Sequence, residues 1–445
     1  MQIKEEDTMK KTLALVLALV MVLGLVACSS GKTETTAPAA DAPKTETKAE
    51  APKAEAPKEE APKAEAPKGE IKIWVADAIV DFTKEQAAAW QAANPEYAGY
   101  TITVEAVGEG DAASNVLTDV EAAADIYGFP TDQLARLVSA GAILELSEEN
   151  AAIVKEENDA GSVGAATMGD LVYAYPLTSD NGYFLYYDKS VIADPSTLEG
   201  IEEACKAAGK NFYMDIRSGW YDVAFFFGAG CHLTYDTDNE GKLTKCNVDY
   251  ASDKGVAALK AMINLKKSGV FVNGSSVDNA TNAAAIVDGT WDSSAAKALF
   301  GDNYACAKLP TFTENGQTYQ MGGFGGFKLL GVKPQTDEDK LAACDSLALF
   351  LSSEAVQLAR YDLTGWGPSN LKAKASDKVR ADEALTALGE QLAFCVVQGQ
   401  YPGDYWSRAE ALGDSIIAGE YDEADDAALL AVLEQFQNDC ISYAK

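Results

Sequence analysis

Apolar and polar residues alternate along two short segments, which predicts β-strands at 70–77 (EIKIWVAD) and 100–107 (YTITVEAV). The alanine-rich segment between them, DFTKEQAAAWQAANP, predicts a helix that begins at Asp81 or Thr83 and is ended by Pro95. A helix at 113–124, a short apolar strand at 124–129 and a helix at 131–146, broken at glycine, follow. This β-α-β-α-β order predicts a mostly parallel sheet covered by helices.

A second α/β region begins with YFLYYDKSVI at 183–192. It contains the strand and turn NFYMDIRSGW, a hairpin around residues 238–241, a helix at 251–269 and the segment AAIVDGTW. The segment MGGFGGFKLLGV (321–332) lacks the Lys-Ser/Thr pair of a phosphate-binding loop and enters a strand, so we interpret its glycines as a crossover between two lobes. The 377 residues from 69 to 445 suffice for two lobes.

An unbroken apolar run precedes this folded part. It extends from Leu13 to Val26 behind two lysines, which is too short to span a bilayer comfortably and typical of a signal-peptide core. The run leads into LVAC at 25–28, which resembles the lipobox of bacterial lipoproteins. That resemblance implies a signal peptide at 1–27 and a lipid on Cys28. The alternative is that Cys28 is an ordinary residue near a conventional cleavage site.

Residues 28–69 consist largely of repeated Ala-Pro-Lys and Ala-Glu units, and seven lysines and eight acidic residues lie between 29 and 68. Such a segment is hydrated, favours extended conformations and cannot form a core. We therefore predict a disordered tether that holds the folded part at the extracellular face of the cell membrane, in a bacterium with a thick cell wall. A spacer with no length requirement is equally compatible with this composition.

The folded part is strongly acidic, since 26 basic and 57 acidic residues between 69 and 445 give a net charge of −31. This charge disfavours nucleic acid and anionic membrane surfaces as partners. The seven cysteines besides Cys28 form no C-x-x-C pair and His232 is the one histidine, so neither a metal site nor a cofactor is predicted. Cys231 and Cys246 flank the hairpin, so a cross-strand disulfide would fit, with free buried thiols as the alternative.

Tryptophans and aspartates indicate a binding site. Four tryptophans lie in turn-like segments with glycine or proline nearby: Trp220, Trp291, Trp366 and Trp406. Each alone is compatible with packing, but together they predict an aromatic-lined cleft. A sugar suits such a cleft, because its apolar face stacks on aromatic rings while its hydroxyls donate to carboxylates. Asp77, Phe129 and Asp132 follow strand ends, where ligands bind on such sheets, and Asp180 is a further carboxylate; for each aspartate, a solvated loop or a helix cap is the alternative.

From IKIWVAD to its end, the chain resembles the substrate-binding proteins of ABC sugar importers, above all the maltose/maltodextrin-binding group. The resemblance is carried by ADIYGFPTDQLARLVSAGAILEL, LVYAYPLTSDNGYFLYYDKSVI, AAIVDGTWDSS, ACAKLPTF and GWGPSN. It implies a type II periplasmic-binding-protein-like α/β fold with two doubly wound lobes around a ligand cleft. The lobes would comprise residues 70–178 with 326–367 and residues 182–322 with 372–445, joined by crossover segments.

The resemblance also implies roles for single residues. Asp77 and Asp132 would bind sugar hydroxyls, Phe129 would stack beside them, and Asp180 would lie near the first crossover. The aromatic platforms would be Trp220, Trp291 and Trp406, with Tyr405 as a substitute for Trp406 and with Trp366 close to a crossover. The implied protein is a monomer without enzymatic activity or cofactor, which delivers an oligosaccharide, an α-glucan by this resemblance, to an ABC transporter permease.

The chain departs from the maltose-binding pattern at Ala78, Phe129, Gln133 and Ser218. Another oligosaccharide or a small solute is therefore an alternative ligand. A surface glycoside hydrolase is an alternative of another class, and it would need two carboxylates on either side of the scissile bond. No local motif pairs such carboxylates in this sequence.

Overall fold

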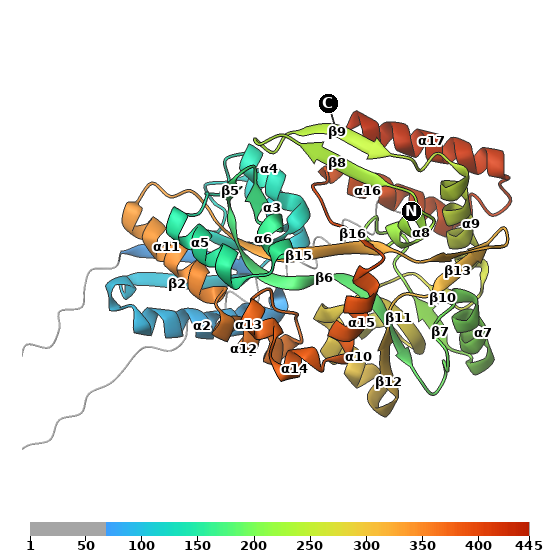
Figure 1. Ribbon diagram of the computed structural model, residues 1–445, viewed down its shortest axis with the longest axis horizontal. Helices are drawn as coiled ribbons and strands as arrows, with labels where there is room; N and C mark the ends of the chain where they lie inside the picture. The colour runs from blue at the N-terminus through green and yellow to red at the C-terminus, as the bar shows by residue number, and fades with distance from the viewer. Residues whose placement is uncertain (1–67, 445) are drawn as a thin grey trace, which may run out of the picture. The chain divides into compact units, whose positions relative to one another are not determined.

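The computed structural model describes residues 68–444. The predicted signal peptide, Cys28 and the tether up to residue 67 lie outside the described residues, so these predictions stay predictions. In the described part, one ten-stranded sheet contributes strands to each of two large hydrophobic cores, and helices pack on it (Figure 1).

The strands of this sheet follow the order β10-β7-β11-β6-β15-β3-β1-β2, with β12 paired to β6 and β16 paired to β15. In chain order they are β1 (Gly69–Val75), β2 (Tyr100–Ala106), β3 (Ile126–Pro130), β6 (Ala174–Asp188), β7 (Asn211–Tyr213), β10 (Phe271–Val272), β11 (Ala283–Gly289), β12 (Tyr304–Ala307), β15 (Gly323–Val332) and β16 (Cys395–Val397). β1 is parallel to β2 and β3, as the β-α-β-α-β order predicts, and β7 is parallel to β10 and β11. β6 and β15 are antiparallel to each other and to their neighbours β11 and β3, so the centre of the sheet is not parallel.

The first core is formed by residues 71–177 and 329–366. Its elements besides the strands above are η1 (Asp77–Ile79), α2 (Val80–Ala93), η2 (Pro95–Tyr97), η3 (Glu109–Asp111), α3 (Ala112–Thr118), η4 (Thr131–Gln133), α4 (Leu134–Ser139), α5 (Glu148–Glu157), α6 (Ala160–Ala165), β4 (Thr167–Met168), β5 (Leu171–Val172), α11 (Glu338–Leu351) and α12 (Glu354–Thr364). The helix expected at 113–124 ends at Thr118, because Asp119 is extended. The break predicted at Gly141 in the helix expected at 131–146 is confirmed, since α4 ends at Ser139 and Gly141 takes a left-handed φ of 62°.

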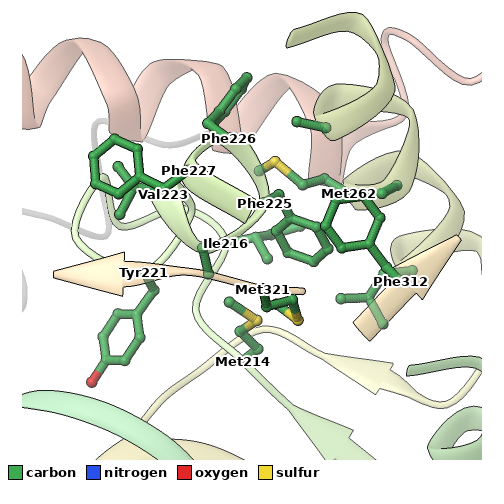
Figure 2. Close-up of a cluster of buried hydrophobic side chains, with 14 of the residues drawn as sticks. Met214, Ile216, Tyr221, Val223, Phe225, Phe226, Phe227, Met262, Phe312 and Met321 are labelled. Atoms are coloured by element: carbon green, nitrogen blue, oxygen red, sulfur yellow. The ribbon is translucent and has the colours of Figure 1, made fainter. Parts of the chain in front are cut away.

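The second core is formed by residues 183–324 and 401–440. Its helices and remaining strands are α7 (Leu198–Ala208), α8 (Val223–Gly228), β8 (Leu233–Thr237), β9 (Leu243–Val248), α9 (Asp253–Lys267), β13 (Thr311–Glu314), β14 (Gln317–Gln320), α16 (Gly403–Ala418) and α17 (Asp426–Ser442). Figure 2 shows the dense packing around α8, where the rings of Phe225 and Phe312 lie 5.4 Å apart, centroid to centroid.

A third, smaller hydrophobic cluster lies beside β6 and β12 and includes residues of the helices α10 and α15. The remaining short elements are η5 (Val277–Asn279), η6 (Thr290–Asp292), α10 (Ser293–Phe300), η7 (Gly301–Asn303), α13 (Leu371–Lys374), α14 (Asp377–Arg380) and α15 (Glu383–Leu392). The exact lobe boundaries expected from the resemblance stay a prediction.

The long strands β6 and β15 connect the two large cores. In β6, Tyr175 belongs to the first core and Tyr183 to the second; in β15, Leu329 belongs to the first and Phe324 to the second. Of the glycines predicted as a crossover, all but Gly322 are part of β15, and a Cβ on Gly325 would lie 2.6 Å from the side chain of Leu392. A larger residue at 325 would therefore require the Leu392 side chain to shift.

The cross-strand disulfide considered between Cys231 and Cys246 is wrong in this structure, where both thiols are free. β8 and β9 do form the predicted hairpin, but their register pairs Cys246 with Tyr235. Cys231 precedes β8 and therefore lies beyond the paired segment. The prediction from the midpoint of the turn missed this register, which a bulge between Asp236 and Thr237 also shifts.

Within residues 68–444, no single helix is long and apolar enough to cross a membrane. The helices α11 and α12 meet the length and composition requirements only together, across a 57° bend. Buried Ala343, Cys344 and Leu347 place α11 in the first core.

Candidate functional site

A cavity of about 600 Å³ is bordered by both cores and by the segments that connect them. The first core contributes Glu109, Gly110, Asp111, Ser114, Pro130, Asp132, Gln133 and Arg136. The second core contributes Trp220, Tyr221, Gly403, Trp406 and Ser407, and the connecting segments add Asn181, Lys328 and Gln398. Trp291 of η6 also lines the cavity and packs against the first core. A separate cavity of about 380 Å³ beside Trp90 is lined by none of the predicted site residues, so the larger cavity is the candidate site.

One side of the cavity, the aromatic wall, consists of Trp220, Tyr221, Trp291 and Trp406. The rings of Trp220 and Trp291 lie 5.6 Å apart at an angle of 51°, and Trp220 meets the edge of Tyr221 at 5.0 Å. The turn before Trp220 is pressed against α16, since a Cβ on Gly219 would overlap with Ala409. Tyr405 fixes this turn from behind, because its hydroxyl donates to the Gly219 carbonyl oxygen at 2.9 Å.

Another part of the lining, the polar wall, consists of Glu109, Asp111, Asp132, Gln133 and Arg136 from η3, η4 and α4. Lys328 Nζ lies 2.8 Å from Glu109 Oε2, and both side chains are only 9% exposed. The same ammonium lies 4.4 Å from the ring centroid of Trp366 and 5.3 Å from that of Trp291, which adds cation–π attraction. Gln133 ties η3 to η4, since it donates to the Gly110 carbonyl and accepts from the Ala113 amide.

Asp132 is the most deeply buried carboxylate of the polar wall, with 3% of its surface exposed. Its Oδ1 accepts a hydrogen bond from Gln398 Nε2 at 2.9 Å. Burial raises the pKa of Asp132 to about 7, while the positive charge of Arg136 and a hydrogen bond from the Asp132 backbone oppose this shift. Asp132 therefore exchanges its proton near neutral pH.

Residues 79–387, more than half of the chain, match the family of bacterial extracellular solute-binding proteins. The chain belongs to this family. Among solved structures, a protein determined with acarbose is 27% identical, with a TM-score of 0.74 over 84% of this chain and 99% of that one. A maltodextrin-binding protein from L. casei BL23 is 26% identical, with a TM-score of 0.69 over 85% of this chain and 99% of its own.

The maltose-maltodextrin binding protein of Alicyclobacillus acidocaldarius is 19% identical, with a TM-score of 0.69 over 83% of this chain and 100% of its own. The solute-binding protein thus has the type II periplasmic-binding-protein-like fold that the sequence predicts, and the resemblance to the maltose/maltodextrin-binding group is confirmed. Among curated proteins, no sequence matches this chain.

Four of the nine ligand-binding residues predicted from the sequence line the cavity of this solute-binding protein: Asp132, Trp220, Trp291 and Trp406. Their contact with a ligand stays a prediction. Asp77 is exposed at the start of η1 and does not line the cavity. Phe129 and Tyr405 are fully buried in the first and second core.

Asp180 and Trp366 lie behind the cavity. Asp180 accepts hydrogen bonds from the Gly367 amide, at 2.6 Å, and from the Thr290 hydroxyl, so it joins β6 to two other segments. Trp366 packs under the Lys328 ammonium and is 4% exposed. Both residues hold the segments that border the site.

Sequence reasoning did not find Lys328, Glu109 or Gln398. Lys328 is the one charged residue in MGGFGGFKLLGV, which is a signal that could have been used, because a lysine in a buried strand needs a partner. Gln398 carries no comparable signal, since its partners lie 178 to 266 residues away in sequence.

Proposed function

We propose that this solute-binding protein binds a maltodextrin-type oligosaccharide in the cavity and delivers it to an ABC transporter permease. The observation that carries the proposal is that one cavity of about 600 Å³ is lined by both an aromatic wall and a polar wall. Pyranose rings have an apolar face that stacks on indole rings and a rim of hydroxyls that donates to carboxylates. Solved relatives with 26–27% identity, one a maltodextrin-binding protein and one determined with acarbose, support this ligand class.

The proposed delivery depends on the two cores closing around the ligand. A ligand that contacts both walls favours the conformation in which both walls are near it, so the permease can distinguish loaded from empty protein. The run of LVAC at 25–28 and the tether at 28–69 support anchoring by a lipid on Cys28 at the extracellular face of the membrane.

Calorimetric titration of the chain without its predicted signal peptide tests the ligand. Maltose, maltotriose, maltotetraose and acarbose should each be added separately, with cellotriose and xylotriose as size-matched controls. Binding of the α-glucans alone is the expected result. Binding of a control sugar alone would contradict the proposed ligand but support a role as a sugar receptor. Release of reducing ends from any sugar would favour a hydrolase.

Incorporation of labelled palmitate into the full chain in a bacterial host tests the anchor. Label is expected in the wild-type protein and not in the Cys28→Ser variant. Release of the wild-type protein into the medium without label would contradict the proposed anchor.

A further inference from the structure

Gln398, which follows β16, joins the two walls of the cavity through one side-chain amide. Its Nε2 donates to Asp132 Oδ1 at 2.9 Å. Its Oε1 accepts from Trp220 Nε1 at 3.1 Å and from Asn181 Nδ2 at 3.2 Å. The side chain is 3% exposed, so these bonds are shielded from water.

The orientation of this amide follows from its partners. An indole N–H is only a donor, so the atom that faces Trp220 must be the amide oxygen. An ionised carboxylate is only an acceptor, so the atom that faces Asp132 must be the amide nitrogen. One glutamine therefore satisfies a donor on the aromatic wall and an acceptor on the polar wall, and no other orientation serves both.

A second glutamine reinforces this contact with the polar wall. Gln400 donates from Nε2 to the Thr131 carbonyl at 2.8 Å and accepts from the Ala135 amide at 2.7 Å. The i, i+2 spacing of Gln398 and Gln400 points both side chains to the same side of an extended segment. Together they hold the turn η4, which carries Asp132, against the segment that leads into α16.

We propose that Gln398 is a positioning residue for ligand binding. It fixes the Asp132 carboxylate and the Trp220 indole at the spacing that one bound sugar must match, and it leaves Oδ2 of Asp132 to accept from a ligand hydroxyl. This inference depends on the proposed function only in assuming that the ligand is a sugar.

Two variants separate this role from a general loss of packing, with maltotriose as the probe in calorimetry at pH 5.5 and pH 8. Gln398→Met removes all three bonds, and its affinity should fall by roughly ten- to a hundredfold at both pH values, relative to wild type at the same pH. Gln398→Glu keeps the acceptor for Trp220 and places an oxygen against Asp132 Oδ1. Its affinity should fall about tenfold at pH 8 and largely recover at pH 5.5, where a proton shared by the two carboxyls restores the bond.

The charged groups around Asp132 do not obscure this comparison. Tyr401 keeps one protonation state between pH 5.5 and pH 8, because burial raises the pKa of Tyr401 well above its ordinary value. The positive charge of Arg136 lies beside Asp132 and is left in place by both substitutions. Glu109 is paired with Lys328, and the side-chain bonds of Gln398 go to neither of these residues. A Gln398→Glu affinity equal to that of wild type at pH 8, or a loss that is the same at both pH values, would overturn the inference.

Gln391 supplies the matched control. It is fully buried in α15, accepts from the Leu309 amide at 2.8 Å and donates to the Gly322 carbonyl at 3.0 Å, away from the cavity. Gln391→Met should lower the unfolding midpoint and leave the affinity for maltotriose unchanged. An affinity loss equal to that of Gln398→Met would show that any buried glutamine has this effect, and would overturn the inference.

A measurement without ligand distinguishes failure of this inference from failure of the proposed function. If wild type binds no sugar, the proposed function fails, and the contact is tested by unfolding alone. Gln398→Glu should lower the unfolding midpoint more at pH 8 than at pH 5.5. This pH dependence should become smaller in the double variant with Asp132→Asn, because only the burial of one carboxyl then remains. A pH dependence of unchanged size in the double variant would show that the two side chains do not interact.

Discussion

The two walls of the cavity differ in what their side chains already bind. On the polar wall, Glu109 is paired with Lys328 and Gln133 is bonded to backbone groups. Asp132 has one carboxylate oxygen bonded to Gln398. On the aromatic wall, Trp220 and Trp291 contact each other at an angle of 51°, which leaves indole surface toward the cavity.

This difference indicates a division of labour. A neutral sugar gains stacking on the aromatic wall without breaking any internal bond, whereas a charged ligand would compete with the Lys328–Glu109 pair. Mutations in the polar wall should therefore lower chiefly the free energy of unfolding, and mutations in the aromatic wall should lower chiefly the affinity. Asp132 is the expected exception, because it makes a structural bond to Gln398 and also lines the cavity.

The largest effect is expected for Lys328→Met. The change leaves the Glu109 carboxylate buried without its cation, so the free energy of unfolding should fall by about 3 kcal/mol. Urea denaturation measures this loss, and the double variant with Glu109→Gln should recover part of it. Lys372→Met is the control, because that lysine is 76% exposed, lies 4.0 Å from Glu354 and should have no measurable effect. If Lys328→Met instead leaves the free energy of unfolding unchanged and abolishes sugar binding, the polar wall serves binding and not stability.

Trp220→Ala should have the largest effect on binding. Removing a central aromatic platform should weaken sugar binding by about a hundredfold, with a smaller loss in Trp220→Phe, which keeps a stacking surface. Calorimetry measures both. Trp74→Ala is the matched control, since that indole donates to Glu105 at the β1–β2 edge and lies outside the cavity. An equal loss in the control would mean that the aromatic wall is not the binding surface.

The fold could be predicted from the sequence where a pattern is local. The alternation in 70–77 and 100–107 located β1 and β2, because one flank of the sheet is a regular β-α-β unit. The helix expected at 113–124 failed because its alanine-rich end follows a turn in which Asp119 accepts from the Ala122 amide. Propensity alone did not reveal that turn.

The site could be predicted where a residue type is unusual in its context. Trp220, Trp291 and Trp406 stand in turn-like sequence contexts, and all three line the cavity. Only Trp220 lies in a turn, since Trp291 belongs to η6 and Trp406 to the first turn of α16. Phe129 and Tyr405 were misplaced because an aromatic residue near a strand end or a helix start is equally suited to a core. Gln398 could not be found, because its role depends on partners that only the fold brings together.

A smaller effect on binding is expected for Asp132→Asn. Burial raises the pKa of Asp132 to about 7, so the folded protein binds this proton more tightly than the unfolded chain. The protonated Asp132 carboxyl therefore makes its full contribution to the free energy of unfolding below pH 4, and this contribution is lost as the pH rises through 7. A ligand hydroxyl favours the ionised form, so wild-type affinity should rise from pH 6 to pH 8.

Asp132→Asn should be insensitive to pH over this range and bind about tenfold more weakly than wild type at pH 8, because a neutral acceptor makes a weaker hydrogen bond. Calorimetry at four pH values measures both quantities. A variant whose affinity still rises with pH would assign the titration to another group.

The smallest effect concerns a contact that holds the walls together from outside the cavity. The tip of the β8–β9 hairpin meets α4 of the polar wall (Figure 1), where a Cβ on Gly241 would overlap with the Ala135 carbonyl oxygen. Gly241 also has a φ of +79°. Gly316 has a similar φ of +75°, but a Cβ added there would have no neighbouring atom within 4 Å. Gly316→Ala should therefore cost only the backbone strain, about 1 kcal/mol.

Gly241→Ala should cost about 1 kcal/mol more than Gly316→Ala, because the hairpin must also move away from α4. Thermal unfolding of the two variants gives this difference directly. If the hairpin sets the distance between α4 and the aromatic wall, Gly241→Ala should also weaken sugar binding by about two- to threefold. Gly316→Ala should leave sugar binding unchanged. Equal stability and equal affinity in the two variants would show that only contacts inside the cavity set the distance between the walls.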